Sequence, residues 1–88
     1  MNAIIAISKI GAAEITEFAA SDAETGLNGF CTLPNGEEAF FFVTGTETKA
    51  GVTCKVRIPG AEAFSIGKIM RRTYAEMLVL GSFKTPQK

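Results

Sequence analysis

The chain has 88 residues, and we expect a single domain over residues 1–88, because so short a chain cannot divide its buried surface between two cores. Hydrophobic residues make up 47% of it and charged residues 20%, which excludes the disordered and collagen-like classes. The net charge is zero, yet residues 1–47 carry a formal charge of −6 and residues 48–88 one of +6. This split favours an anionic partner, unless strands from the two halves lie side by side and their charges pair.

The first element is expected at residues 3–10, a nearly continuous apolar run rich in isoleucine and typical of a buried strand. No basic segment precedes it and no cleavage pattern follows it, so a signal peptide is not expected. No apolar stretch approaches the roughly 18 to 20 residues that cross a bilayer. We therefore expect a soluble, cytoplasmic protein with no membrane partner.

Residues 12–20 fit two structures. Apolar residues such as Ile15 and Phe18 recur at helical spacing, but the same segment also fits a second strand, and the sequence does not choose between them. Residues 21–26 then cluster serine, aspartate, threonine and glycine, which is typical of a surface loop.

A hairpin is the clearest local feature of the chain. Residues 27–33 and 38–44 are apolar strands that flank Pro34-Asn35-Gly36, and Asn-Gly between two such strands favours a tight hairpin turn. Side chains alternate along a strand, so the three consecutive phenylalanines of the second strand are divided between its faces: Phe40 and Phe42 on one, Phe41 on the other.

Residues 52–58 alternate cleanly and predict a half-buried strand with a basic outer face. The inward positions are Val52, Cys54, Val56 and Ile58, and the outward ones are Thr53, Lys55 and Arg57. The two cysteines, Cys31 and Cys54, belong to no metal-binding or redox motif, and we expect them to be small buried hydrophobes without a disulfide.

Pro59-Gly60 ends this strand, and residues 61–72 are expected to form a short helix with Gly67 in its middle. Its packed residues would be Phe64, Ile66, Ile69 and Met70. Residues 73–80 alternate and predict a last strand, followed by a flexible tail at residues 82–88.

These elements predict a mainly β fold (a β-rich α+β protein): a small curved antiparallel sheet, or an OB-like partial barrel of five to six strands, with one short helix near residues 61–72. A flat antiparallel sheet backed by a helix uses the same elements.

Catalysis is not expected, because the chain contains no histidine, the usual general base and metal ligand. No nucleophile elbow, phosphate-binding loop or dinucleotide fingerprint is present. The acidic pair Glu37-Glu38 lies beside the hairpin turn, where solvated charges are ordinary. We therefore expect a binding protein that uses no cofactor and no metal.

The candidate binding residues lie in the basic half. Lys55 and Arg57 share one strand face in any topology, and a helix folded back beside that strand would extend the patch along a phosphate backbone. Aromatic side chains would then provide platforms for bases, one of them from the three consecutive phenylalanines. The candidate site is Lys49, Lys55, Arg57, Lys68, Arg71, Arg72, Tyr74 and Phe41. Since the isoelectric point is near 6.2, such a site must be local.

The leading hypothesis is an OB-like homo-oligomer that binds single-stranded nucleic acid. In size and order of elements the chain is similar to the short single-strand-binding proteins of filamentous phages, a likeness of layout without a shared motif. The alternative, typical of mobile-element proteins, is an inhibitor or sequestering protein that binds a host protein through its acidic face or a subunit groove, with Asp22, Glu24, Glu37 and Glu38 imitating phosphates. A second alternative is a structural assembly subunit.

Overall fold

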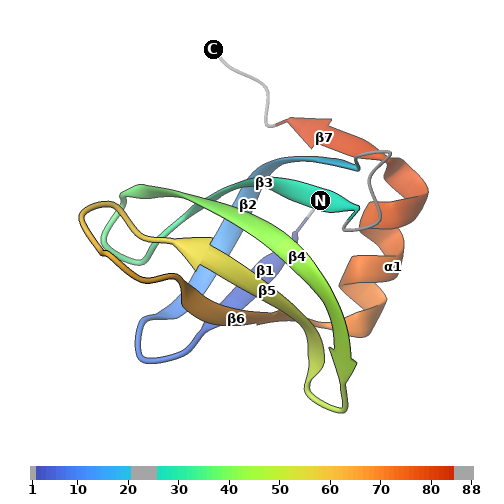
Figure 1. Cartoon of the computed structure of the whole chain (residues 1–88). Coiled ribbons are helices and arrows are strands. Elements are labelled where there is room, and N and C mark those ends of the chain that lie inside the picture. The colour runs from blue at the N-terminus through green and yellow to red at the C-terminus, as the bar shows by residue number, and fades with distance from the viewer. Residues whose placement is uncertain (1, 21–25, 85–88) are drawn as a thin grey trace.

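The computed structural model describes residues 2–20 and 26–84, and this part of the chain forms seven strands and one helix (Figure 1). In chain order the elements are β1 (Ile4–Ile7), β2 (Gly11–Ala20), β3 (Leu27–Thr32), β4 (Glu38–Thr48), β5 (Gly51–Arg57), β6 (Ser65–Ile69), α1 (Arg71–Leu80) and β7 (Ser82–Lys84). The predicted mainly β fold with one short helix is confirmed.

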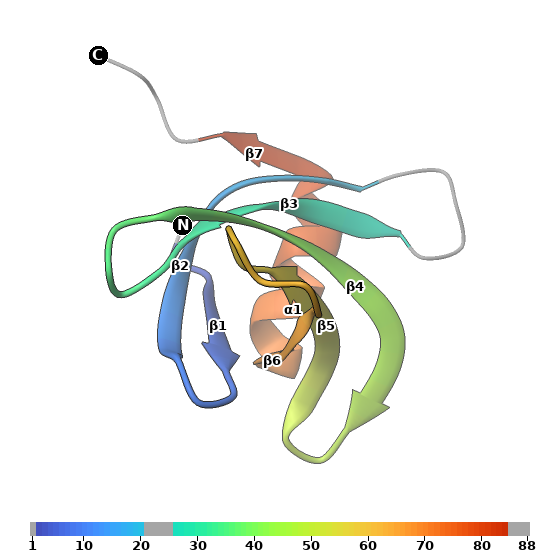
Figure 2. The same ribbon diagram turned by 60° about the vertical axis from the view of Figure 1, so that its left-hand side comes forward.

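Six of the strands close into an antiparallel barrel of the OB-like kind. The strand order is β1-β6-β5-β4-β3-β2, and β1 also pairs with β2, which completes the ring (Figure 2). Strand β2 is long enough to have two partners on one edge: its first half pairs with β1 and its second half with β7. Closure leaves the ring itself without a free edge.

The core fills the barrel with alternate side chains from every strand of the ring. Its largest members are Phe18 from β2 and Phe41 from β4, both fully buried. Helix α1 lies across one end of the barrel (Figure 1) and adds Met77, its one buried residue, to this core. A small barrel is filled by such side chains and leaves no channel.

The predicted hairpin is confirmed as β3 and β4, with Thr32 opposite Glu38 at its closed end. The turn is fixed by Asn35, whose side chain accepts a hydrogen bond from the Glu37 amide at 2.9 Å. The segment 12–20, which the sequence left open, is a strand within β2. The first strand is shorter than predicted, because residues 8–10 form the exposed turn between β1 and β2.

The helix predicted at residues 61–72 is wrong: this segment contains a loop and strand β6. Gly67 explains the difference, because it faces the barrel interior, where a Cβ would lie 2.5 Å from Cγ2 of Ile5 and 3.1 Å from Sγ of Cys54. The glycine that weakened a predicted helix is therefore the position that allows β1, β5 and β6 to approach closely.

The strand predicted at residues 73–80 is also wrong, since Arg71–Leu80 is helix α1. The helix directs Tyr74 and Met77 towards the core, three positions apart, and ends at Gly81, whose φ of 80° suits a glycine. The predicted tail begins as strand β7, which pairs with β2 over residues 82–84. Residues 85–88, and most of the loop predicted at residues 21–26, lie outside the described residues.

Within the described ranges, no helix has the length and apolar character required to span a lipid bilayer.

Candidate nucleic-acid interface

Aromatic side chains cover the outer surface of the hairpin β3–β4. Phe30 and Phe40 are opposite each other across the two strands, and their ring centroids lie 5.7 Å apart in an edge-to-face arrangement. Phe42 follows on the same face of β4, with its centroid 6.1 Å from that of Phe40. All three rings are partly exposed, because outward positions of a barrel wall alternate with core positions.

A fourth ring comes from the loop between β5 and β6. Phe64 is 43% exposed, and its ring meets Phe42 edge-on at a centroid distance of 5.3 Å. The four rings thus form one continuous surface, which we call the aromatic patch: Phe30, Phe40, Phe42 and Phe64. Exposed phenylalanines in contact with one another, rather than scattered singly, indicate a binding surface.

Two cations border the aromatic patch from strand β5. Arg57 is opposite Phe40 and Lys55 is opposite Phe42 in the β4–β5 register, so both side chains emerge on the same face as the rings. The Lys55 ammonium lies 5.9 Å from the Phe64 ring centroid and the Arg57 guanidinium 5.3 Å from it. Cation–π attraction at these distances holds both charged groups beside the patch while leaving them accessible to a phosphate.

Further basic residues continue along the wall towards α1. Lys68 of β6 is paired with Thr53 of β5, and its ammonium donates a 2.6 Å hydrogen bond to the threonine Oγ1. Arg71 donates from Nε to the carbonyl oxygen of Thr48 at 3.1 Å, which places it at the end of β4 beside Lys49 in the β4–β5 turn. The predicted sharing of a face by Lys55 and Arg57 is confirmed, and Lys68 joins them.

Three of the predicted site residues do not belong to this surface. Phe41 is fully buried in the core, so its selection as a stacking platform is wrong; the partly exposed rings of β4 are those of its neighbours, Phe40 and Phe42. Tyr74 is partly buried against the core on the inner face of α1. Arg72 lines a groove on the outer face of α1, away from the rings.

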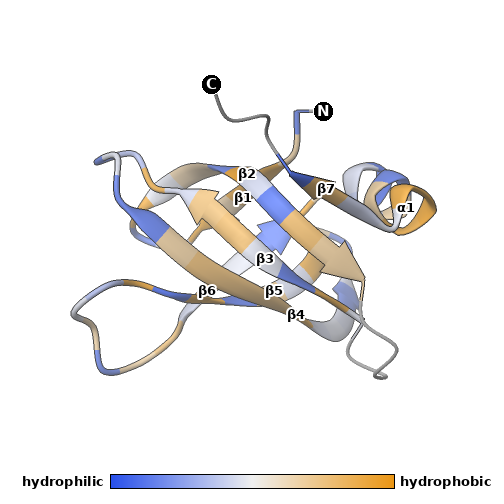
Figure 3. Ribbon diagram, turned by 90° about the horizontal axis from the view of Figure 1, so that it is seen from above, coloured by the Kyte–Doolittle hydropathy of each residue, from blue (hydrophilic) through white to orange (hydrophobic). Residues whose placement is uncertain are grey.

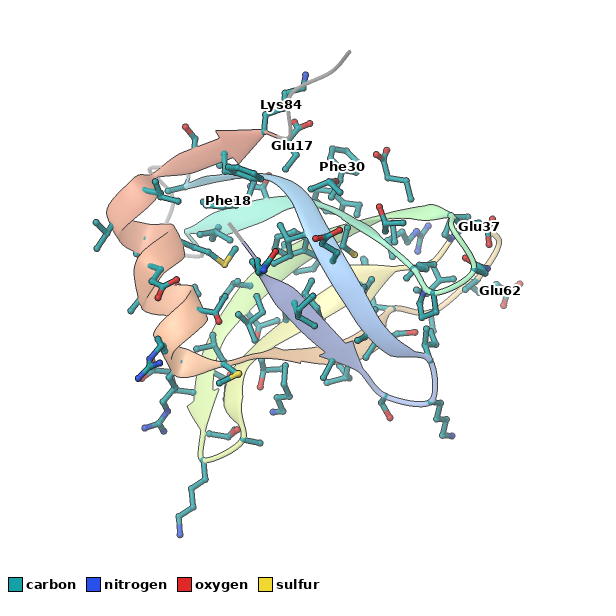
Figure 4. All side chains as sticks on the ribbon, turned by 180° about the vertical axis from the view of Figure 1, so that it is seen from behind. Glu17, Phe18, Phe30, Glu37, Glu62 and Lys84 are labelled. Carbon is teal, nitrogen blue, oxygen red and sulfur yellow. The ribbon has the colours of Figure 1, made fainter. Side chains whose placement is uncertain are left out.

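The opposite end of the barrel is acidic. Figure 4 shows Glu37 and Glu62 at the end away from α1. Glu14 of β2 and Glu38 of β4 lie opposite Thr32 of β3, one on each side of it. Thr32 is two residues further along β3 than Phe30. Both ends of the wall also carry the opposite charge, since Arg57 donates to the Glu62 carbonyl oxygen at 3.5 Å, and Glu47 precedes Thr48, the residue that Arg71 contacts near α1. Asp22 and Glu24 lie outside the described residues.

One row of residues across neighbouring strands places a basic and an acidic side chain next to the aromatic patch. Lys84 of β7 is opposite Glu17 of β2, and Glu17 is opposite Phe30 of β3. Figure 4 shows these three side chains projecting outwards along one rim, whereas Phe18 lies on the inner side. Glu17 thus marks the border of the patch on its β2 side.

The two cysteine side chains lie in the core of the barrel. Cys31 and Cys54 are unpaired and buried, and burial raises the pKa of the Cys31 thiol from 9.0 to about 11 and that of Cys54 to about 12. Such thiols are protonated and poor nucleophiles at neutral pH. No group of three or more potential metal-ligating side chains is found within residues 2–20 and 26–84.

Phe30 and Phe64 are the residues that sequence reasoning missed. The hairpin turn carried the signal for Phe30, because the turn sets the register and thereby the residue opposite Phe40. Phe64 had no such signal, since its position depends on the loop after β5.

No protein-family model, curated protein or solved structure matches the chain significantly.

Proposed function

We propose that this protein binds single-stranded nucleic acid on the outer face of β3, β4, β5 and β6. The observation that carries the proposal is the aromatic patch with Lys55 and Arg57 held over one of its rings. Proteins that bind single strands combine exposed aromatic faces, on which bases stack, with cations that follow the phosphates.

The geometry favours an unpaired strand over a duplex. Bases reach the aromatic faces of a protein only when they are unstacked from their own neighbours. The four rings span β3, β4 and the β5–β6 loop, which suits a short site of about four nucleotides, the lower end of the range for one OB-like barrel.

Charge supports a defined course for the phosphates. The basic residues Lys55, Lys68 and Arg71 lie in succession between the patch and the α1 end of the wall. The acidic residues at the far end repel phosphates, so the backbone is expected to leave the patch towards α1. The contacts are with phosphates and ring faces, which predicts weak dependence on base sequence.

The test is fluorescence anisotropy with a labelled single-stranded oligonucleotide over a range of salt concentrations. With three or four phosphate contacts, the slope of log affinity against log salt is expected to be about −2 to −3. Lys55→Glu or Arg57→Glu should each weaken binding about tenfold at low salt. The matched control is Lys9→Glu, the same charge change in the exposed β1–β2 turn. Absent or salt-independent binding, or equal losses in Lys9→Glu and Lys55→Glu, would refute the proposal.

One observation favours the second candidate function, an inhibitor of a host protein. Four carboxylates, those of Glu14, Glu37, Glu38 and Glu62, lie towards one end of the barrel, as a phosphate mimic requires. A pull-down that yields one stoichiometric protein partner and no oligonucleotide, and that fails with Glu38→Lys, would support this function instead.

A further inference from the structure

The aromatic patch has two borders of different chemistry. On β5 it is bordered by the cations Lys55 and Arg57. On the other side, towards β2, the residues next to the rings are Asn28 and Glu17, both partly exposed. Figure 3 shows β3, β4 and β5 side by side on this side of the barrel. Cations bind phosphates, whereas amides and carboxylates form hydrogen bonds with base edges, so the two borders suit the two ends of one nucleotide.

The sheet register arranges these groups in two rows, of which the first crosses three strands. Asn28 of β3 is opposite Phe42 of β4, and Phe42 is opposite Lys55 of β5. Two strand spacings, about 10 Å, thus separate Asn28 from the cation. On its far side Asn28 is opposite Ala19, whose side chain is too small to cover the amide. A base stacked on Phe42 with its phosphate at Lys55 therefore turns its edge towards Asn28.

The second row repeats this order with a carboxylate. Glu17 of β2 is opposite Phe30, and the row continues through Phe40 to Arg57 of β5. Figure 4 shows Glu17 and Phe30 projecting to the same side of the barrel. Lys84 of β7 is opposite Glu17, yet in the part of the chain that the structure describes the Glu17 carboxylate forms no hydrogen bond or ion pair. The carboxylate therefore keeps its acceptor capacity for a ligand.

A carboxylate selects among bases by the groups on their edges. Glu17 can only accept hydrogen bonds, so it pairs with the exocyclic amino group of cytosine, adenine or guanine. Thymine and uracil lack this group, and the carbonyl oxygens beside their one N–H repel a carboxylate. Asn28 does not discriminate in this way, because an amide both donates and accepts. Selection is therefore expected from the second row alone.

We infer that the phosphates follow the β5 border while the base edges meet Asn28 and Glu17, and that Glu17 makes the site prefer bases with an exocyclic amino group over thymine and uracil. This inference rests on the proposed function. Three of the four bases carry the amino group, so the preference agrees with a weak dependence on base sequence.

Two oligonucleotides that differ only at the base edge test the inference. Oligo(dC) and oligo(dU) of one length have the same backbone and ring size, so their charge and stacking area are closely matched. In fluorescence anisotropy at one salt concentration and neutral pH, wild type should bind oligo(dC) about tenfold more tightly, as expected for one base-edge contact. Glu17→Gln should bring the two affinities within about twofold of each other, because an amide accepts from the amino group and donates to a carbonyl.

Two further variants serve as controls. Glu14→Gln removes the same charge from β2 at a position opposite Thr32, outside the patch, so it should raise both affinities alike and keep their ratio. Asn28→Ala should weaken the binding of both oligonucleotides and also keep the ratio. Both affinities are measured on one preparation, so a partial loss of folding lowers both and leaves their ratio unchanged.

A preference for oligo(dC) that is lost in Glu17→Gln and kept in both controls would support the inference. Equal affinities of wild type for the two oligonucleotides, or an unchanged ratio in Glu17→Gln, would overturn it and leave the proposed function standing. If wild type binds neither oligonucleotide, the proposed function fails and the inference fails with it.

Discussion

Two neighbouring residues of β4 have opposite surroundings, one in the core and one on the outer surface of the barrel. Phe41 is fully buried and faces Val56 of the next strand, whereas Phe42 is partly exposed and faces Lys55. The two side chains are chemically identical and adjacent in sequence. The side of the wall on which each one emerges decides whether it fills the core or forms part of the aromatic patch.

Strand β5 repeats the contrast with other residue types. Cys54 points inwards, and Lys55, the next residue, points outwards towards the Phe64 ring. The inner surface of the wall therefore carries side chains that fill the core, and the outer surface carries the exposed rings and cations through which we propose that the protein binds its ligand. Substitutions on the two surfaces should accordingly affect different measurements.

The largest effect is expected from Phe41→Ala, which leaves a cavity in the barrel. The free energy of unfolding should fall by about 3–5 kcal/mol, the usual cost of removing a buried phenylalanine ring. Urea denaturation followed by circular dichroism measures this change. Phe41→Leu, which keeps most of the volume, should cost much less. A loss below about 1 kcal/mol in Phe41→Ala would contradict the assignment of this ring to the core.

The next effect is expected from Phe42→Ala, and it should appear in binding rather than in folding. Loss of one stacking platform should weaken oligonucleotide binding by about 1–3 kcal/mol. The free energy of unfolding should change far less than in Phe41→Ala, because the ring is partly in water. Anisotropy titration and urea denaturation of the same preparations give the two values.

Two controls sharpen the Phe42 experiment. Phe42→Tyr retains a π face and should bind nearly as well as wild type, whereas Phe42→Leu retains apolar area without a ring and should bind poorly. If Leu and Tyr bind equally, the patch acts by general hydrophobic contact and stacking is not its mechanism. If Phe42→Ala loses as much stability as Phe41→Ala, the contrast between the two surfaces is wrong.

The smallest effect is expected from the inward thiol of β5. Burial raises the pKa of Cys54 from 9.0 to about 12, so the folded protein keeps the proton at pH values where the unfolded chain releases it. This contribution to stability is complete below pH 9.0 and declines as the pH rises towards 12. Between pH 8 and 10, the free energy of unfolding should fall by about 1 kcal/mol more in wild type than in Cys54→Ala. Equal decreases in the two proteins would show that this thiol is not protected by the fold.

The parts of the fold that the sequence predicted are those where one local pattern suffices. Strand β5 alternates from Val52 to Arg57, and the Asn35-Gly36 turn sets the hairpin register, so the inward and outward residues of both could be assigned. The candidate cations of β5 followed from the same alternation. No long-range contact was needed for either.

The C-terminal third failed because its pattern has two interpretations. Residues 61–72 offer apolar residues at helical spacing, but Ile69 faces the core, Ile66 faces outwards and Gly67 fits only between β1 and β5. That constraint comes from Ile5, far away in sequence. For the same reason Phe64 was expected to be packed in a core, and its place in the aromatic patch could be seen only from the fold.

The closure of the barrel also affects how the chain acquires its structure. Pairing of β1 with β6 brings Ile5 opposite Ile69, so the ring forms only after most of the chain is available. Contacts between such distant segments slow folding, because a long stretch of chain must be ordered before they form. Until then β1 and β5 have unpaired edges that other chains can join. During synthesis, the chain is therefore most prone to aggregation until residues 65–69 have been made and can pair with β1 and β5.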